Sequence, residues 1–450
     1  MFPDQVSSLN SVALFFTLCM GILILRLPRR LALVPVALIT CYMTFGQKVL
    51  IFDLDFTMLR LLVLFACARI ILRREFRSFL WLKIDTVFLL WIFFSIITYT
   101  LLWQTTEAIV NRLGTAYDAA GLYFTFRFLV RDIEDVIRIC KMFAVVLFPM
   151  AACMFVEYLT GRNLFYMFGG VPEFTVIRDG LLRCQGPFRH PILAGTFGAV
   201  WLPLFVGFWW QNRRNRLLAV LGALSSLMIT LLSGSSGPIA VYMAGILGCA
   251  MWFVRRHMRA ARWGIVIGII VLHLIMKDPV WFIFARIKIL SGSTGWHRSN
   301  LIDRMVAHFF DWWLVGAKNI EEWGVWWGDI TNEYILQAVR GGLITFLLFI
   351  YIVVLAFSGV GKAMAAAKEK SRESKLFIWA IGCMLFSHAM AFLNVAYFDQ
   401  NIVNWYLCLA MIAAAVNVYC LRATNMAGVI ATTGESPASN CTAEEAVSYE

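Results

Sequence analysis

Apolar residues occur along this chain in long uninterrupted runs, separated by short segments rich in arginine and lysine. Runs of about 17–25 residues are long enough to cross the roughly 30 Å hydrocarbon core of a bilayer as a helix. The pattern therefore predicts an all-α polytopic membrane protein with about 12–13 transmembrane helices. The predicted helices cover 10–26, 31–46, 56–72, 85–103, 115–130, 142–158, 191–210, 217–232, 238–254, 263–276, 333–357, 376–392 and 402–421.

Composition excludes a water-soluble globular protein. Of the 450 residues, 61% are hydrophobic and only 15% are charged, and the mean hydropathy is +0.75. A soluble domain carries about 25% charged residues, so this chain has too few to cover a surface that faces water. We expect one membrane domain over residues 1–422. Residues 423–450 turn polar and are predicted to form a disordered cytoplasmic tail.

Basic residues alternate from loop to loop. Every second loop is rich in them, and together these loops hold 24 of the 39 Lys and Arg residues. The positive-inside rule then predicts an outer N-terminus and a cytoplasmic C-terminus. Topology and contact with anionic membrane lipid explain the net charge of +12, so we expect no nucleic-acid partner.

Two large loops on the predicted outer face, about 159–190 and about 277–332, break this rule. They have no topological reason to be basic, yet they carry Arg162, Arg178, Arg183, Arg189, Lys277, Arg286, Lys288, Arg298, Arg304 and Lys318, with Arg340 just inside the next predicted helix. Arginine presents a rigid fork of donors that matches phosphate, so the cluster indicates an anionic substrate. For any single residue, solvated loop surface or contact with lipid headgroups is an equally good explanation.

The first of these loops ends directly before a predicted helix, in the segment Leu182-Arg183-Cys184-Gln185-Gly186-Pro187-Phe188-Arg189-His190-Pro191. Proline suits the first turn of a helix. Arg183, Arg189 and His190 would then lie beside a helix N-terminus, which favours a negative ligand. A simple structured turn is the alternative.

The second loop contains a predicted amphipathic helix at about 301–314, with Asn300 just before it and Asp303 in its first turn, the spacing of a capping box. Such a helix lies in the membrane interface. Its apolar face comprises Leu301, Ile302, Met305, Val306, Phe309, Phe310 and Trp313, and its polar stripe Asn300, Arg304, His308 and Asp311.

With these motifs in view, residues 115–357 resemble the bacterial O-antigen ligase and polysaccharide polymerase family of membrane glycosyltransferases. Arg183 to Pro191 is similar to that family's Arg-x-x-Gly-x-Phe-x-[Asn/His]-Pro element, and Ser233 to Gly237 falls where members carry a serine-rich outer turn. Arg298 and the helix through Leu314-Val315-Gly316 resemble the family's amphipathic loop with its Leu-x-Gly turn. Asp329 to Leu343 resembles the His-Asn-x-Tyr-Leu…Gly-Gly-Leu segment.

The resemblance implies transfer of a glycan from undecaprenyl diphosphate to an acceptor glycan or glycolipid, at the periplasmic face of the bacterial inner membrane and without a cofactor. Arginines would hold the diphosphate and stabilise the charge that develops as it leaves. The expected diphosphate contacts are first Arg183 and Arg298, then Arg340, Arg286 and Arg189, with His190 and Asn332 beside them.

One position departs from the family. Thr331 stands where members usually carry the histidine expected to deprotonate the acceptor. Asp329, His297 and His308 are the candidate replacements, with His190 also considered. A solvated histidine or aspartate is the alternative reading of each. The departure leaves open a relocated base, a mechanism without one, or an inactive relative.

Two further readings remain open. The rival function is a transporter or flippase of lipid-linked glycans, which would favour charged residues deep in discontinuous helices. Asp53 and Asp55 have a spacing that some metal-dependent glycosyltransferases use, but two acids at a helix start also satisfy its dipole, so we expect no metal. Arg60 and Arg127 stand within apolar runs and are expected to pair structurally inside the bundle, with Asp55 and Asp118 within reach.

Overall fold

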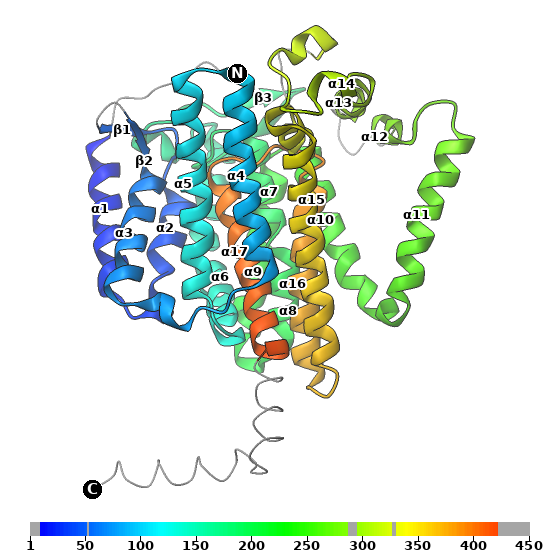
Figure 1. Cartoon of the computed structure of the whole chain (residues 1–450). Coiled ribbons are helices and arrows are strands. Elements are labelled where there is room, and N and C mark those ends of the chain that lie inside the picture. The colour runs from blue at the N-terminus through cyan, green and yellow to red at the C-terminus, as the bar shows by residue number, and fades with distance from the viewer. Residues whose placement is uncertain (1–9, 52–53, 287–294, 326–329, 422–450) are drawn as a thin grey trace, which may run out of the picture.

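The computed structural model describes residues 10–51, 54–286, 295–325 and 330–421, and this part of the chain is a bundle of roughly parallel and antiparallel helices (Figure 1). The N-terminal half supplies α1 Ser11–Arg26, α2 Val34–Tyr42, α3 Met58–Leu72, α4 Lys83–Trp103, α5 Thr106–Leu129 and α6 Ile133–Thr160. The C-terminal half supplies α7 Pro191–Ala199, α8 Leu202–Gln211, α9 Arg216–Leu232, α10 Ser236–Ala250, α11 Met258–Ile275, α12 Ile283–Arg286, α13 Gly295–Ala307, α14 Phe309–Trp312, α15 Glu333–Ala366, α16 Arg372–Ala391 and α17 Gln400–Val416.

The prediction of an all-α polytopic membrane protein is confirmed. Eight helical stretches in the described residues are long and apolar enough to cross a membrane, and α1 is a shorter apolar helix. The eight are Lys83–Trp103, Ile133–Thr160, Pro191–Gln211, Arg213–Leu232, Ser236–Ile275, Glu333–Ala366, Arg372–Ala391 and Gln400–Cys420. Two of the predicted crossings are shorter than expected: α2 has nine residues where 31–46 was predicted, and α3 has fifteen where 56–72 was predicted.

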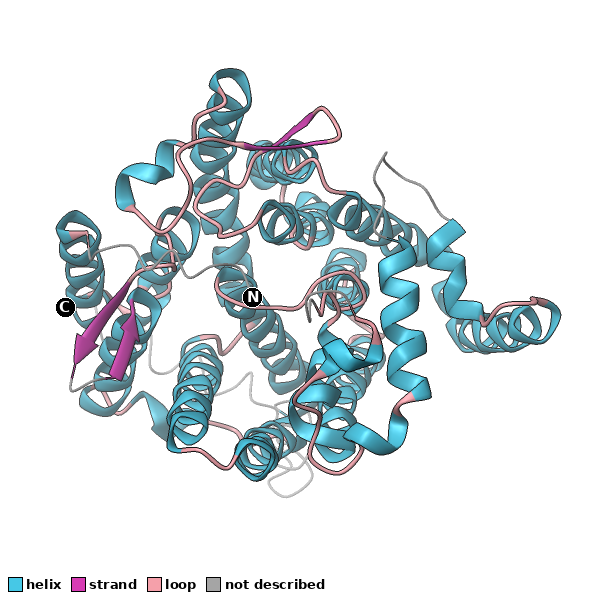
Figure 2. Cartoon of the chain, turned by 90° about the horizontal axis from the view of Figure 1, so that it is seen from above, coloured by secondary structure: helices cyan, strands magenta, loops and turns pink. Residues whose placement is uncertain are grey.

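Among the described residues, two short antiparallel hairpins accompany the helices and lie toward the edge of the bundle when it is viewed from above (Figure 2). One joins β1 Lys48–Ile51 to β2 Leu54–Thr57, and the other joins β3 Val176–Arg178 to β4 Leu181–Arg183. Asp179 and Gly180 connect β3 to β4, both with positive φ, which is the turn that an Asp-Gly pair favours between twisted strands.

The basic loops lie together at one end of the bundle, where their arginines bind neighbouring loops. Arg29 pairs with Asp135 at 2.5 Å, and Arg131 donates to the Glu75 carbonyl at 2.8 Å. The loops at 159–190 and 295–332, where described, lie at the opposite end (Figure 1). Which end faces the cytoplasm stays a prediction from the charge alternation.

Charged side chains inside the bundle are paired, as expected, but one partner differs from the expectation. Arg60 binds Asp118 with a 3.0 Å contact, as the sequence indicated. Arg127 binds Asp85 of α4 instead, at 2.8 Å, and the Tyr123 hydroxyl donates to the same carboxylate. Both members of this pair are almost fully buried. Because a buried charge without a partner is costly, each side chain stabilises the other by neutralising its charge.

Helix α15 was predicted as one crossing over 333–357, but it folds back on itself at Gly342, whose φ of 66° and ψ of −173° are not helical. A straight helix would hold Tyr334 and Phe349 about 22 Å apart, yet their ring centroids are 6.0 Å apart. Trp91 of α4 likewise contacts both Gln337 and Phe349. Residues 333–341 therefore form a half-helix that packs beside the membrane-crossing part of α15.

Helix α11 corresponds to the predicted crossing at 263–276 but stands apart from the bundle (Figure 1). None of its residues is buried, although its composition is strongly apolar. An apolar helix with no protein neighbour on its long faces is suited to contact with lipid.

The amphipathic helix of the second loop is present with different bounds. It begins at Gly295 rather than near residue 301 and is interrupted at His308, after which α14 continues. Asn300 therefore lies inside α13, and the predicted capping box is wrong. Leu301 and Trp312 are buried in a small core against α15, whereas Phe310 is 83% exposed.

Candidate functional site

The loop between α6 and α7 places Arg183 against the turn between α9 and α10. The Cys184 amide donates to the Leu232 carbonyl at 2.9 Å, which fixes the backbone beside Arg183. The Arg183 Nη2 atom donates to Ser235 Oγ at 2.6 Å, and Ser235 is the residue that precedes α10. Arg183 is 8% exposed, and its Nε has no hydrogen-bond partner among the described residues.

Glu157, near the end of α6, holds this loop in place. Its carboxylate accepts from the backbone amides of Gln185 at 3.0 Å and Gly186 at 2.9 Å, and from the Thr175 hydroxyl. The Asn163 side chain donates to the Gly186 carbonyl on the other side. Glu157 is buried and acts through the loop, so it is a positioning residue for Arg183.

Arg298 reaches the same end of α10 from α13. A Cβ on Gly237, the second residue of α10, would lie 3.2 Å from Arg298 Nη2, so the guanidinium group rests directly on this first turn. Arg298 is 8% exposed and has no hydrogen bond or ion pair with any described residue. Burial lowers the pKa of Arg298 to about 10, which still leaves it charged at neutral pH.

His190 caps α7 beside these arginines. Its Nδ1 accepts from the Ile192 amide at 3.2 Å, which leaves the proton of the neutral ring on Nε2. Burial, with smaller contributions from the positive charges of Arg183 and Arg178, lowers the pKa of His190 to about 4. A neutral His190 at pH 7 adds no positive charge, so the site's charge comes from its arginines.

Two glycines allow the segment 313–317, which follows α14, to pack tightly against α15, and this contact is called the clasp. A Cβ on Gly316 would lie 2.1 Å from the Val339 carbonyl oxygen, and one on Gly342 would lie 2.4 Å from the Leu314 carbonyl oxygen. Backbone hydrogen bonds from Leu343 to Trp313 and from Ala317 to Val339 close the clasp. The structure thus brings the Leu-x-Gly and Gly-Gly-Leu segments of the sequence into direct contact, which couples the helix of Arg298 to the half-helix of α15.

A polar cavity of about 290 Å³ opens beside this half-helix, between α3, α4, α5, α15 and α17. Two ion pairs line it: Arg60 with Asp118, and Arg189 with Asp399. Its walls also carry the aromatic rings of Phe45, Trp91, Phe349, Phe392, Tyr397, Phe398, Trp405 and Tyr406. The loop between α16 and α17 borders both places, because Asn394 lies next to Gly237, which Arg298 contacts, while Tyr397 and Asp399 line the cavity.

Three more charged residues line the cavity: Arg112, Arg340 and Glu333. Glu333 is 6% exposed, and its carboxylate accepts from the Tyr397 amide at 2.6 Å and from Gln337 Nε2 at 2.7 Å. Arg112 is 8% exposed and lies over the Tyr99 ring at 4.2 Å, while Arg340 is exposed. Both arginines are close enough to Glu333 to interact with it electrostatically.

The other candidate residues are dispersed. His308 binds Asp311 at 2.9 Å and stacks on Trp323, and His297 is half-buried on α13. The Asn332 side chain caps the half-helix by accepting from the Ile335 amide. Asp329 and the side chain of Arg286 lie outside the described residues, as does Asp53. The roles predicted for all these residues stay predictions.

Arg112 and Glu333 were missed by the sequence reasoning. Arg112 fell just before the predicted helix at 115–130, whereas α5 begins at Thr106, with the Thr105 side chain accepting from the Ala108 amide. A threonine before a helical run is a start signal that would have extended the prediction. Glu333 follows the cap residue Asn332, a position where an acidic residue suggests only dipole compensation.

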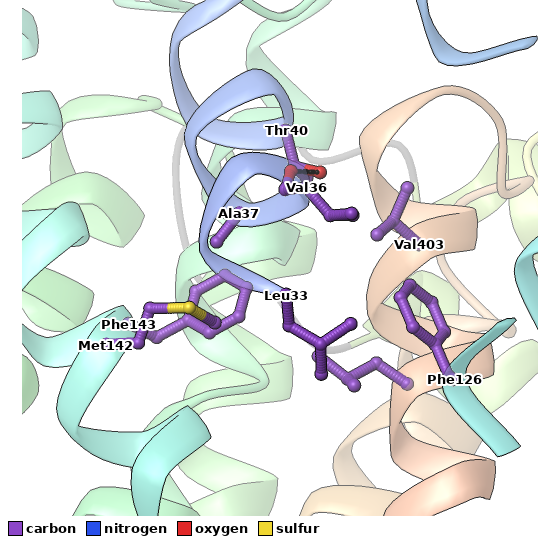
Figure 3. A pocket seen from close by; sticks show the side chains of 9 residues that line it. Leu33, Val36, Ala37, Thr40, Phe126, Met142, Phe143 and Val403 are labelled. Atoms are coloured by element: carbon purple, nitrogen blue, oxygen red, sulfur yellow. Dashed lines mark hydrogen bonds between the residues drawn. The ribbon is translucent and has the colours of Figure 1, made fainter. Parts of the chain in front are cut away.

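A second cavity lies between α2, α5, α6 and α17 and has a volume of about 10 Å³, room for no more than one water molecule (Figure 3). Its walls are apolar apart from Thr40, whose hydroxyl donates to the Val36 carbonyl. It is therefore a packing gap and not a ligand site.

No protein-family model matches this chain, and neither does any characterised protein. Function therefore has to be argued from the site.

Proposed function

We propose that this protein transfers a glycan from undecaprenyl diphosphate to an acceptor sugar at the outer face of the bacterial inner membrane, as a polysaccharide ligase or polymerase. The observation that carries the proposal is the buried guanidinium of Arg298, which has no partner among the described residues. A buried charge without a counter-ion costs several kcal/mol, about as much as breaking a buried ion pair. An anionic ligand at this position removes that cost.

A diphosphate fits the surroundings of Arg298. Arg183 and Arg298 approach the first turn of α10 from two different loops, and the amides of that turn favour negative charge. Arginine forks bind phosphate oxygens in pairs and stay protonated throughout the physiological range. Bound this way, the two arginines stabilise the diphosphate as it leaves the anomeric carbon.

Glu333 supplies the proton acceptor in this proposal. It lies two residues after Thr331, where the family that this sequence resembles usually carries a histidine, and it is a cavity-lining carboxylate that forms no ion pair with a described residue. A carboxylate that faces a cavity can take the proton of an acceptor hydroxyl as the glycosidic bond forms. The acceptor sugar accordingly occupies the polar cavity.

Two observations favour a second function. The break in α15 at Gly342 and the buried charges of Arg112 and Glu333 are features of transporters, whose substrate sites lie at discontinuous helices. Under this reading the protein moves lipid-linked glycans across the membrane and performs no chemistry.

Glycan profiles separate these functions. A deletion strain is complemented with the wild type, with Arg298→Ala, with Arg183→Ala, or with Arg162→Ala. Arg162 is a matched control because it is an exposed arginine at the same end of the bundle. If the protein is a transferase, the first two variants lose long-chain glycan, lipid-linked units accumulate on the outer leaflet, and Arg162→Ala restores the normal profile.

The stage at which synthesis stops identifies the reaction. Single repeat units on carrier or acceptor indicate a polymerase, and full chains that stay on the carrier indicate a ligase. Accumulation of lipid-linked units on the inner leaflet would favour the transporter. Normal profiles from Arg298→Ala and Arg183→Ala at equal expression would refute the site assignment.

A further inference from the structure

The charges around the polar cavity do not balance, which bears on the substrate that the cavity accepts. Arg60 and Arg189 are neutralised by Asp118 and Asp399. Two arginines, Arg112 and Arg340, then face the single carboxylate of Glu333. Among the described residues that line the cavity, one positive charge is left over.

Of these two arginines, Arg112 is the buried one, so it has the greater need of an anionic partner. It is more than nine-tenths buried, its Nε has no partner, and its guanidinium forms no ion pair with a described residue. Its contact with the Tyr99 ring stabilises the cation but supplies no hydrogen-bond acceptor. Arg340 lines the same cavity, and its positive charge acts unfavourably on that of Arg112.

Glu333 does not serve as the missing counter-ion. Its two oxygens accept from Gln337 and from the Tyr397 amide, and neither lies within 4 Å of a described arginine nitrogen. The remaining lone pairs of this carboxylate are acceptors for hydroxyl groups. The cavity therefore offers two forked cationic donors, Arg112 and Arg340, together with the acceptor oxygens of Glu333.

The walls between these groups suit a sugar ring. Trp91, Trp405, Tyr406 and Phe349 line the cavity, and aromatic faces pack against the apolar C–H faces of pyranoses. A volume of about 290 Å³ lies near the lower limit of typical small-ligand sites. The cavity thus holds about one sugar residue and not a long oligosaccharide.

Resting on the proposed transfer function, we infer that the cavity is the acceptor subsite and that it selects an acidic sugar, such as a hexuronic acid. The sugar carboxylate lies between Arg112 and Arg340, where each guanidinium can bind it with paired hydrogen bonds. A ring hydroxyl of the same sugar faces Glu333. A neutral hexose would leave the extra positive charge of the cavity without a counter-ion.

The test compares two probes that differ only at C6, methyl β-D-glucuronide and methyl β-D-glucoside. Binding to the purified protein in nanodiscs of phosphatidylcholine is measured by saturation-transfer NMR and by calorimetric titration. Charged hydrogen bonds contribute about 1.5–3 kcal/mol, so the glucuronide should bind at least about tenfold more tightly than the glucoside. Arg112→Gln and Arg340→Gln should each remove most of that preference, and Arg162→Gln should keep it.

Arg340→Gln keeps the test decisive if Arg112→Gln fails to fold, because Arg340 is exposed and its loss leaves no buried gap. Equal binding of the two probes, or an unchanged preference in Arg340→Gln, would overturn the inference. Nanodiscs of phosphatidylglycerol form a second arm: if this lipid abolishes glucuronide binding, the cavity holds a lipid headgroup and the inference is wrong. The assay contains no lipid-linked donor, so its outcome is independent of whether transfer itself occurs.

Discussion

Replacing Gly342 with alanine is expected to open the clasp between α15 and the segment 313–317 that follows α14. With a φ of 66° and a ψ of −173°, Gly342 lies in a backbone region that essentially only glycine adopts. An alanine there costs about 1–3 kcal/mol in backbone strain. Its Cβ would also lie 2.4 Å from the Leu314 carbonyl oxygen and 2.9 Å from the Val315 nitrogen. Because these neighbours are backbone atoms, no side-chain rotation relieves the overlap.

This strain alone shifts the equilibrium constant between the closed and the open clasp toward the open form by a factor of about 5 to 150. Gly361→Ala is the matched control, because Gly361 lies farther along the same helix with no atom within 4 Å of an added Cβ. Removing glycine from a helix interior stabilises it by about 0.5–1 kcal/mol. The two substitutions therefore add the same methyl group with opposite predicted effects.

Thermal unfolding of both variants in detergent, followed by tryptophan fluorescence, measures the difference. Gly342→Ala should unfold at a lower temperature than the wild type and should fail to restore long-chain glycan. Gly361→Ala should match or exceed the wild-type unfolding temperature and should restore it. If the two variants behaved alike, the reversal of α15 at Gly342 and its contact with Leu314 would be refuted.

Three further outcomes are expected. The pKa of His190, lowered to about 4 from 6.5, means that the unfolded chain takes up a proton on this ring before the folded protein does. Stability should therefore fall as the pH drops from about 6.5 to 4, and the midpoint of thermal unfolding should fall less for His190→Asn, which keeps a helix cap. Asp85→Asn or Arg127→Met alone should destabilise the protein by about 3–5 kcal/mol because each leaves a buried charge, whereas the double variant should recover much of the loss in the same assay. Glu157→Gln places an amide nitrogen against one of two loop amides, which should cost about 1–3 kcal/mol and weaken glycan transfer more than Arg162→Gln does.

Part of the candidate site could be predicted from the sequence. The two basic loops depart from the positive-inside rule, which is visible without any structure, and the resemblance to a glycosyltransferase family then selected Arg183 and Arg298 within them. The structure brings both to the first turn of α10. Arg340 and Arg189 were chosen on the same grounds, but they line the polar cavity instead. Which of these arginines lie near one another depends on which helices pack together, and the hydrophobic periodicity of the sequence does not specify that packing.

The sequence by itself determined that this protein folds in a lipid bilayer, that it is all-α, and that basic residues alternate from loop to loop. Each follows from local chemistry, because a run of apolar residues in lipid has to satisfy its own backbone hydrogen bonds, and a helix does so within the segment. Only the tertiary structure decided that α15 reverses at Gly342, that Arg127 pairs with Asp85, and that Arg112, Arg340 and Glu333 line one cavity. These features join residues that are distant along the chain or on opposite sides of a reversal, and their energies arise from burial and charge compensation between helices. Such energies exist only once the helices have packed.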